Sequence, residues 1–212
     1  LNGAFPGDRN GSLGRRLAFA LEDALYSSAD FLADLHSGDC NESLHPLVFF
    51  PTAGEKDVNA AALEAAKALS VDYRVRSTAR NGLYSWAVQR GVPALLVERG
   101  GQGRWSQPEV DACKADVYAL MGHLGILPGG EKNRVQQEIV EANYVESDAD
   151  GFWYPLVAKN QDVCMGEVLG RLESLTGELL QEVRAKFDGV VLYHTVALGV
   201  HMGEALIAYG HT

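Results

Sequence analysis

The sequence has few cysteines, fewer basic than acidic residues and no long apolar run, and each shortage excludes a class of protein. Its 212 residues include three cysteines. Cys40, Cys113 and Cys164 stand far apart and form no Cys-x-x-Cys pair. The sequence therefore predicts neither a disulfide framework nor a thiolate zinc site, and a reducing, cytoplasmic setting is expected.

Membrane and nucleic-acid partners are not expected either. No apolar stretch approaches the roughly 18 residues of a membrane-spanning helix. No basic start followed by an apolar middle marks a signal peptide. The 28 acidic residues outnumber the 18 basic ones and give a net charge of −10, which repels phosphate backbones and acidic membrane surfaces.

What the sequence does contain is an alternation of helical and strand patterns over its first 130 residues. Apolar residues recur every fourth position from Leu13 to Leu25, a stripe typical of a helix. Further helices are expected over residues 57–69, 83–91 and from Ser106, where Ser-Gln-Pro-Glu fits a capping box. Compact apolar runs, at residues 29–36, 45–51, 72–77 and 92–98, predict the intervening strands. An α/β domain with a largely buried sheet is expected over residues 1–130.

The pattern changes after the Pro/Gly-rich segment 127–134. Short β-prone runs follow, and "VCMGEVLG" from Val163 is echoed by "VHMGEALI" from Val200. A repeat with a turn glycine in each copy indicates two similar halves related by a pseudo-two-fold axis. We therefore expect residues 131–212 to form a small, all-β, barrel-like C-terminal domain.

Two strand ends supply the first candidates for chemistry. Asp34 and His36 are two residues apart at the end of an apolar run, so on a strand their side chains share one face. Functional groups gather beyond the carboxyl ends of strands in open α/β sheets. His36 is thus a candidate metal ligand, with a carboxylate or carbonyl orienting its other ring nitrogen. The alternative is a structural histidine that caps the strand and binds a loop.

Glu98 is the second candidate. It follows the apolar residues 94–97 and precedes Arg99 and two glycines. A carboxylate at the end of a buried strand has a raised pKa, which suits proton transfer. The alternative is an ordinary ion pair at the edge of the sheet.

The other candidates are weaker. Asn2, in "LNGAFPG", is in isolation only a loop residue, and the remaining five histidines have no metal-ligand spacing. Three arginines, Arg80, Arg90 and Arg104, could meet an anionic substrate, but their spacing selects none.

The order of these motifs is more specific than any single one. Asn2 with Phe5-Pro6-Gly7, then Asp34 to Gly38, then Val97 to Gly100, then a β domain, resembles the succinylglutamate desuccinylase/aspartoacylase family. The resemblance implies a zinc-carboxypeptidase-like mixed sheet flanked by helices, with a β domain appended. It also implies a zinc-dependent deacylase acting on an N-acyl amide or ester bond of a small amino-acid-like molecule.

The resemblance also assigns roles to individual residues. His36 matches the last zinc-binding histidine of the family, Glu98 its general base, and Asn2 the asparagine of a substrate-binding Asn-Arg pair. Gly3 stands where that pair has its arginine. The family's other two zinc ligands, a His and a Glu, precede the Asn-Arg motif, and because Leu1 is not an initiator methionine we expect an N-terminal portion beyond this sequence.

Two further hypotheses remain at this stage. A non-catalytic binding or scaffold protein could keep the fold without the metal, and Gly3 favours it. The C-terminal repeat also resembles a biotinyl/lipoyl-type barrel, but the corresponding turn, Glu173 to Glu178, contains no lysine. The domain is therefore expected to be structural, either shaping the entrance of the active site or forming contacts in a homo-oligomer.

Overall fold

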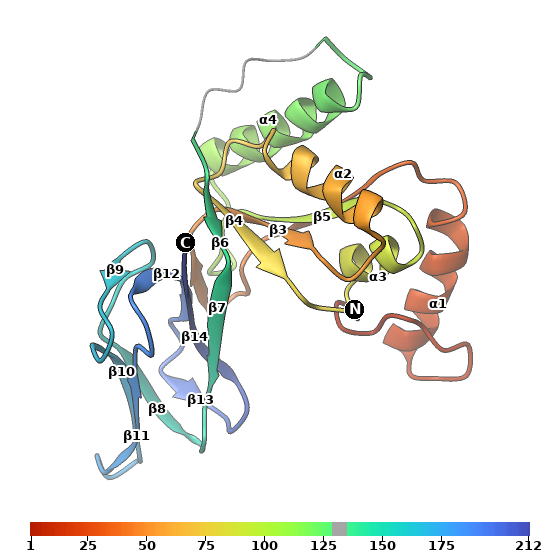
Figure 1. Cartoon of the computed structure of the whole chain (residues 1–212). Helices are drawn as coiled ribbons and strands as arrows, with labels where there is room; N and C mark the ends of the chain where they lie inside the picture. The colour runs from red at the N-terminus through yellow and green to blue at the C-terminus, as the bar shows by residue number, and fades with distance from the viewer. Residues whose placement is uncertain (129–134) are drawn as a thin grey trace. The chain divides into compact units, whose positions relative to one another are not determined.

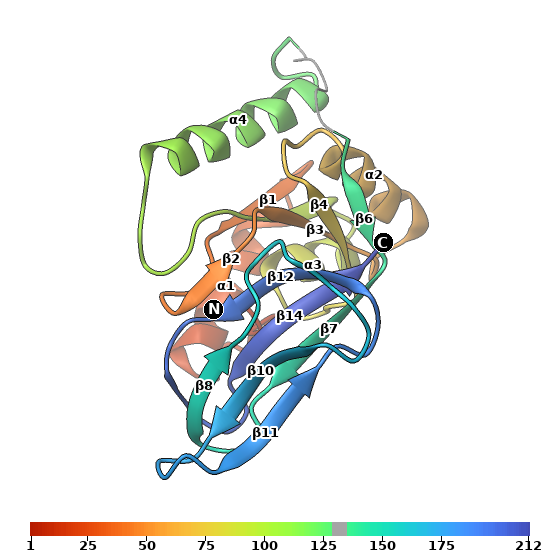
Figure 2. The ribbon, with the colours of Figure 1, turned by 90° about the vertical axis from the view of Figure 1, so that its left-hand side faces the viewer.

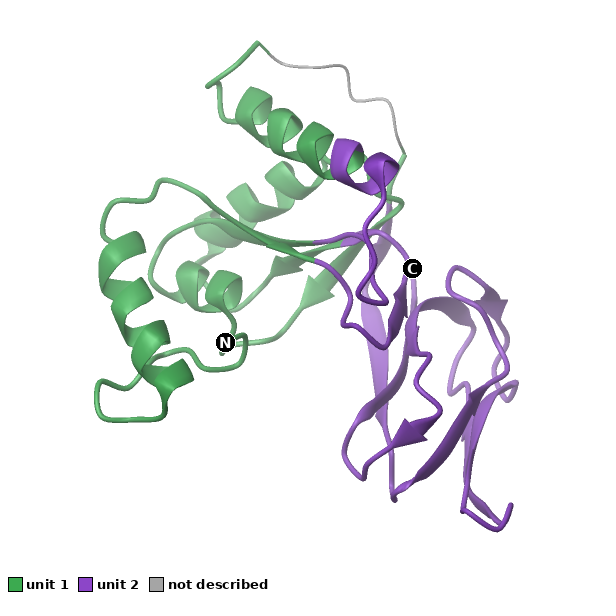
Figure 3. Ribbon diagram, turned by 180° about the vertical axis from the view of Figure 1, so that it is seen from behind, with its two compact units in different colours: residues 1–36, 48–97, 112–136 green, residues 37–47, 98–111, 137–212 purple. Residues whose placement is uncertain are grey.

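The computed structural model describes residues 1–128 and 135–212. The chain forms two compact units, shown in Figure 3. Unit 1 contains Leu1–His36, Val48–Val97 and Ala112–Gln136, and unit 2 contains Ser37–Leu47, Glu98–Asp111 and Gln137–Thr212. The predicted domain boundary between residues 130 and 131 lies outside the described residues.

A five-stranded sheet accounts for the strands expected in the first half of the chain. Its order is β1 (Leu32–His36), β5 (Ala94–Glu98), β3 (Leu47–Pro51), β4 (Tyr73–Ser77) and β6 (Gln137–Ile139). Within the described residues four helices accompany it: α1 (Leu13–Leu25), α2 (Lys56–Ala66), α3 (Leu83–Gln89) and α4 (Gln107–His123). The predicted α/β alternation is confirmed, and the amide of Glu109 donates to Ser106 Oγ at 3.3 Å at the expected capping box.

The alternation of side chains along β5 divides the core of unit 1 between two faces of the sheet. Leu95 and Val97 pack in a cluster with residues of α2 and α4, whereas Ala94 and Leu96 pack with residues of α1 and α3. Figure 1 shows α2 and α4 on one side of the sheet and α3 on the other. Because both faces are covered by helices, β5 is a nearly continuous apolar run, as expected for a buried strand.

Helix α1 buries only part of the leucine stripe that predicted it, because Leu21 alone of the four leucines packs against a core cluster. Leu13 is 80% exposed and Leu17 is 48% exposed, whereas Ala18 and Tyr26 are buried. The helix thus packs through a small residue and an aromatic ring against the cluster that holds α3. Periodicity predicted the helix correctly, but it did not predict which face is buried.

Strands β1 and β5 are neighbours in the sheet and run in the same direction. Near their starts, the amide of Leu32 donates to the carbonyl of Pro93 at 3.0 Å. Just beyond their ends, the amide of Gly38 donates to the carbonyl of Gly100 at 3.4 Å. Parallel neighbours place their carboxyl ends at the same edge of a sheet, and here these ends are His36 and Glu98.

Unit 2 is rich in strands and contains two sheets. One has the order β11 (Leu179–Arg184), β10 (Val168–Glu173), β8 (Gly151–Pro155) and β13 (Gly199–Val200). The other has the order β2 (Glu42–Leu44), β12 (Gly189–Thr195), β14 (Ala205–His211) and β7 (Glu141–Glu146), with β9 (Asp162–Val163) paired to β12. Figure 2 shows most of these strands, among them β8, β10 and β11 of the first sheet and β12, β14 and β7 of the second. The described strands form open sheets, and no closed barrel is found among them.

The internal repeat appears as two matching turns. Met165 and Met202 each precede a glycine with φ of +86°, a conformation that favours glycine. The amide of Met165 donates to Asp188 Oδ1 at 2.7 Å, and the amide of Met202 donates to Asp150 Oδ1 at 2.9 Å. Each Asp-Gly pair therefore caps the Met-Gly turn of the other copy, which supports the predicted pseudo-two-fold relation.

The turn between β10 and β11 lies where the carrier hypothesis placed its hairpin. The amide of Ser174 donates to the carbonyl of Glu178 at 2.8 Å, which closes the turn. Its residues include no lysine. No helix in the described ranges is both long and apolar enough to cross a membrane.

Candidate functional site

The end of β1 holds an imidazole and a carboxylate on one face, as the spacing predicts. His36 Nε2 lies 3.0 Å from Asp34 Oδ1. The Asp34 side chain is only 11% exposed and that of His36 is 28% exposed. The other carboxylate oxygen of Asp34, Oδ2, is buried and accepts no hydrogen bond from a described residue. A buried carboxylate thus holds one ring nitrogen of a partly accessible imidazole, an arrangement common behind metal-binding histidines.

Tyr26 lies near Asp34 in unit 1. Its hydroxyl donates to the carbonyl of Leu83 at 2.8 Å. Burial raises the pKa of Tyr26 well above its ordinary value, and the charges of Glu22 and Asp34 raise it further. The phenol therefore stays a neutral hydrogen-bond donor close to the Asp34 carboxylate.

Glu98 ends β5, and the structure surrounds it with groups that sequence analysis missed. Its Oε2 atom is buried. Burial raises the pKa of Tyr193, on β12, and the charges of Tyr144, Glu42 and Glu98 raise it further. Glu98 therefore lies in the same electrostatic environment as Tyr193 and Glu42, all within unit 2.

Strand register explains why these side chains gather. Tyr193 and Tyr144 both pair with Ala208 of the central strand β14. Because alanine is small, the two rings approach across it, with centroids 6.5 Å apart. On its other side Tyr193 pairs with Leu44 of β2, the strand that begins at Glu42. The two tyrosines therefore lie on one face of this sheet. The charges of Glu42 and Glu98 act on Tyr193 at that face.

Asn2 and Gly3 lie in a turn at the start of the chain. Asn2 Oδ1 lies so close to Gly82 that a Cβ at Gly82 would be 2.5 Å from it. Gly3 has φ of +88°, which an arginine would adopt only with strain. The backbone here is therefore suited to the glycine that replaces the expected arginine.

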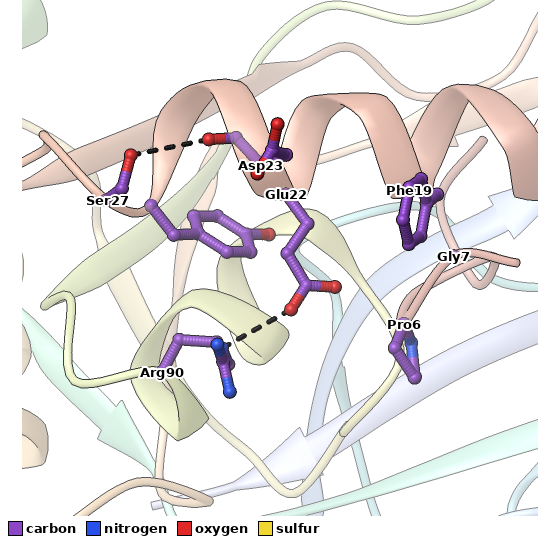
Figure 4. Close-up of a pocket in the computed structure, with 8 residues that line it drawn as sticks. Pro6, Gly7, Phe19, Glu22, Asp23, Ser27 and Arg90 are labelled. Atoms are coloured by element: carbon purple, nitrogen blue, oxygen red, sulfur yellow. Dashed lines mark hydrogen bonds and ion pairs between the residues drawn. The ribbon is translucent and has the colours of Figure 1, made fainter. Parts of the chain in front are cut away.

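One of the three candidate arginines is already engaged in a pocket of unit 1. Figure 4 shows Arg90 directed at Glu22, and its Nε is 3.3 Å from Glu22 Oε1. Pro6 and Phe19 also line this pocket, which has a volume of about 590 Å³. Arg104 instead lines a pocket of unit 2, formed mainly by the loop that follows Glu98.

The described residues contain no group of three or more His, Cys, Asp or Glu side chains placed to hold a metal ion. His36, backed by Asp34, is suited by its chemistry to supply one ligand. A zinc site needs at least two more. The fit to zinc is therefore partial within the described ranges.

Comparison with known families supports the resemblance read from the motifs. The family model described as the succinylglutamate desuccinylase/aspartoacylase catalytic domain matches residues 1–124. A curated relative, the N-alpha-acetyl-L-2,4-diaminobutyric acid deacetylase of Halomonas elongata, is 27% identical over 216 residues, which cover 97% of this chain and 63% of the relative.

Solved structures show the same fold. The product-bound ectoine utilization protein EutE (DoeB) of Ruegeria pomeroyi has a TM-score of 0.87 and 26% identity, over 100% of this chain and 67% of that one. A succinylglutamate desuccinylase/aspartoacylase of Rhodobacter sphaeroides has a TM-score of 0.82 and 24% identity, over 99% of this chain and 67% of that one.

The chain thus spans 63% of the curated relative's length and 67% of the lengths of these two solved chains. The family model covers more than half of the chain. The likeness of fold extends across both units of the chain. The chain belongs to the succinylglutamate desuccinylase/aspartoacylase family.

Proposed function

We propose that the protein is a zinc-dependent deacylase with a zinc-carboxypeptidase-like fold that hydrolyses the N-acyl amide bond of a small amino-acid-like substrate. Family membership supports this proposal, as does the relative named as an N-alpha-acetyl-diaminobutyric acid deacetylase. An acetylated diamino acid is accordingly the first substrate to test. The single structural observation that supports it best is the Asp34–His36 pair at the end of β1.

His36 is proposed as a zinc ligand through Nδ1, because Asp34 engages Nε2. The buried carboxylate fixes the ring orientation and raises the basicity of the liganding nitrogen. Bound zinc would supply a Lewis acid that makes water a strong nucleophile near neutral pH. The proposal requires the remaining ligands to come from residues other than those the structure describes.

Glu98 is proposed as the general base. It accepts a proton as water attacks the acyl carbon, and it returns that proton to the nitrogen when the carbon–nitrogen bond breaks. The products are a carboxylic acid and a free amine. Glu98 continues the face of β5 that Ala94 and Leu96 present, and His36 continues the face of β1 that Leu32 presents. Ala94, Leu96 and Leu32 all pack in one cluster, which supports a shared face for the two functional groups.

Asn2 is proposed to contact the substrate, with no contribution from position 3, where Gly3 has no side chain. A substrate carboxylate therefore has to be bound by another cation.

A direct test is to purify the full-length protein, measure its zinc content, and follow the release of free amine from N-acetylated amino acids. The proposal predicts about one zinc per chain and amine release that a chelator abolishes and added zinc restores. A protein that stays metal-free and inactive in the presence of zinc would support the alternative, a scaffold that keeps the fold without catalysis.

A further inference from the structure

A pocket of about 300 Å³ in unit 2 begins two residues after Glu98. Three segments and one lysine line it: the loop after β5, the first turn of α4, and strand β2, with Lys159 from the loop after β8. All of these residues belong to the unit that contains Glu98. The pocket is therefore a candidate for binding the part of the substrate that extends from the reacting bond.

The loop wall of this pocket is fixed by its backbone. Gly100, Gly101, Gln102 and Gly103 all have positive φ, which a loop of ordinary residues would not adopt. The amide of Gln102 donates to the carbonyls of Asp39 at 3.0 Å and Glu42 at 3.1 Å. These bonds tie the loop to the segment that carries β2, so the two walls hold their spacing before a ligand enters.

The lining carries charges of both signs. Glu42 and Glu109 supply carboxylates, and Arg104 and Lys159 supply cations. Lys159 Nζ donates to the carbonyl of Leu44 at 2.7 Å, so it is already directed at the backbone. Arg104, on the exposed loop, is the cation better placed to bind a substrate carboxylate, because guanidinium binds carboxylates in bidentate fashion.

Glu42 is a partly buried carboxylate of the pocket. Its Oε2 accepts a hydrogen bond from the amide of Asp39 at 3.2 Å. Burial nevertheless raises the pKa of Glu42, and the charge of Asp39 adds to the rise. An ammonium group that binds beside a half-buried carboxylate stabilises its charged form against burial and against the repulsion of other carboxylates.

Trp105 adds a surface that suits the same kind of ligand. Its side chain is 80% exposed although it lines the pocket. Exposed indole rings bind ammonium groups through their faces. An indole beside Glu42 and Glu109 favours a cation over a neutral apolar group.

We propose that this pocket binds the amino-acid part of the substrate, and that Glu42 selects an N-acylated diamino acid by pairing with its side-chain ammonium while Arg104 binds its carboxylate. The proposal rests on the proposed deacylase function. It adds a pocket for the amino-acid part of that substrate, a small zwitterion with one free cationic amine, and a residue that determines specificity.

Binding can be separated from turnover by calorimetry on the full-length protein after chelator treatment, which the proposed function predicts to abolish hydrolysis. The two ligands are N-alpha-acetyl-2,4-diaminobutyrate and N-alpha-acetyl-2-aminobutyrate, which differ chiefly in the side-chain amine. Glu42→Gln should weaken binding of the first about 10- to 100-fold, the range for a lost charged hydrogen bond, and leave the second unchanged. Arg104→Gln should weaken both equally. Glu178→Gln, in the exposed turn between β10 and β11, is the matched control and should change neither.

Equal affinity of the wild-type protein for the two ligands, or equal weakening of both by Glu42→Gln in a variant with normal thermal stability, would overturn this inference. Rates of amine release from the same two compounds test the proposed function separately. Selective binding without turnover would contradict the deacylase and keep the assigned pocket. Turnover of both compounds at equal efficiency would do the reverse.

Discussion

Asp34 and His36 face the same side of β1, and a carboxylate oxygen of the first lies 3.0 Å from Nε2 of the second. The carboxylate orients the imidazole through one ring nitrogen, the contact that the proposed role of His36 requires. The strand sets the shared face, and burial of Asp34 keeps the carboxylate from exchanging its partner for water.

Asp34→Asn should weaken zinc binding by the full-length protein about 10- to 100-fold, as is typical when the partner behind a metal-binding histidine is changed. The amide keeps the size of the side chain but loses the negative charge. Competition with a chromophoric chelator measures the affinity. Asp30→Asn, at an exposed position just before β1, is the control, and an equal loss in both variants would remove Asp34 from this role.

Alanine substitutions at two glycines, one in the core of unit 2 and one on the surface of unit 1, test the described packing. A Cβ on Gly170 would overlap the indole ring of Trp153, which is 1% exposed. Gly170→Ala should therefore cost about 1–3 kcal/mol of unfolding free energy through overpacking. Gly14, on α1, has open space around its Cα, so Gly14→Ala should stabilise the protein by about 0.5–1 kcal/mol. Denaturant titration measures both, and a similar small effect at both positions would show that the β10–β8 contact is looser than described.

Local patterns predicted the helices and strands and the two candidate residues at the strand ends, His36 and Glu98. They could do so because the apolar pattern of a strand or helix reflects which of its faces is buried. The same patterns could not reveal strand β2. Its three residues, Glu42–Leu44, show no periodicity, and its partner β12 begins at Gly189. Glu42 and Tyr193 were missed for that reason, since only the pairing of segments distant in the chain brings these side chains near Glu98. The leucine stripe of α1 shows the converse, because it predicted the helix although Leu21 is the one leucine of the stripe that packs against the core cluster.

Glu42 should make stability depend on pH in the acidic range. Burial raises its folded pKa above the ordinary 4.5, so the folded state keeps its proton where the unfolded state has lost it. Stability therefore falls as the pH rises from 4.5 through the folded pKa. Glu42→Gln should melt at a higher temperature than the wild type at pH 7 and at about the same temperature below pH 4.5, the ordinary value. A lower melting temperature at pH 7 would mean that the carboxylate is stabilised by its surroundings.

Tyr193 should produce a corresponding effect in the alkaline range. Its folded pKa is raised above 10.0, so above that pH the unfolded state ionises first and stability falls as the pH rises. Tyr193→Phe should lose less stability than the wild type above pH 10.0. Tyr118→Phe, whose parent side chain on α4 is 61% exposed, should behave like the wild type. Thermal melts across this range measure the difference, and identical slopes for all three proteins would contradict the burial of the Tyr193 phenol.

The turnover of the full-length, zinc-loaded Glu98→Gln variant tests the proposed role of Glu98 most directly. If Glu98 moves the proton, the rate of amine release should fall by about 10²- to 10⁴-fold, while zinc content and substrate affinity stay at wild-type values. Glu146→Gln, at an exposed position on β7, should keep full activity. Undiminished turnover by Glu98→Gln would contradict the central claim that this carboxylate is the general base.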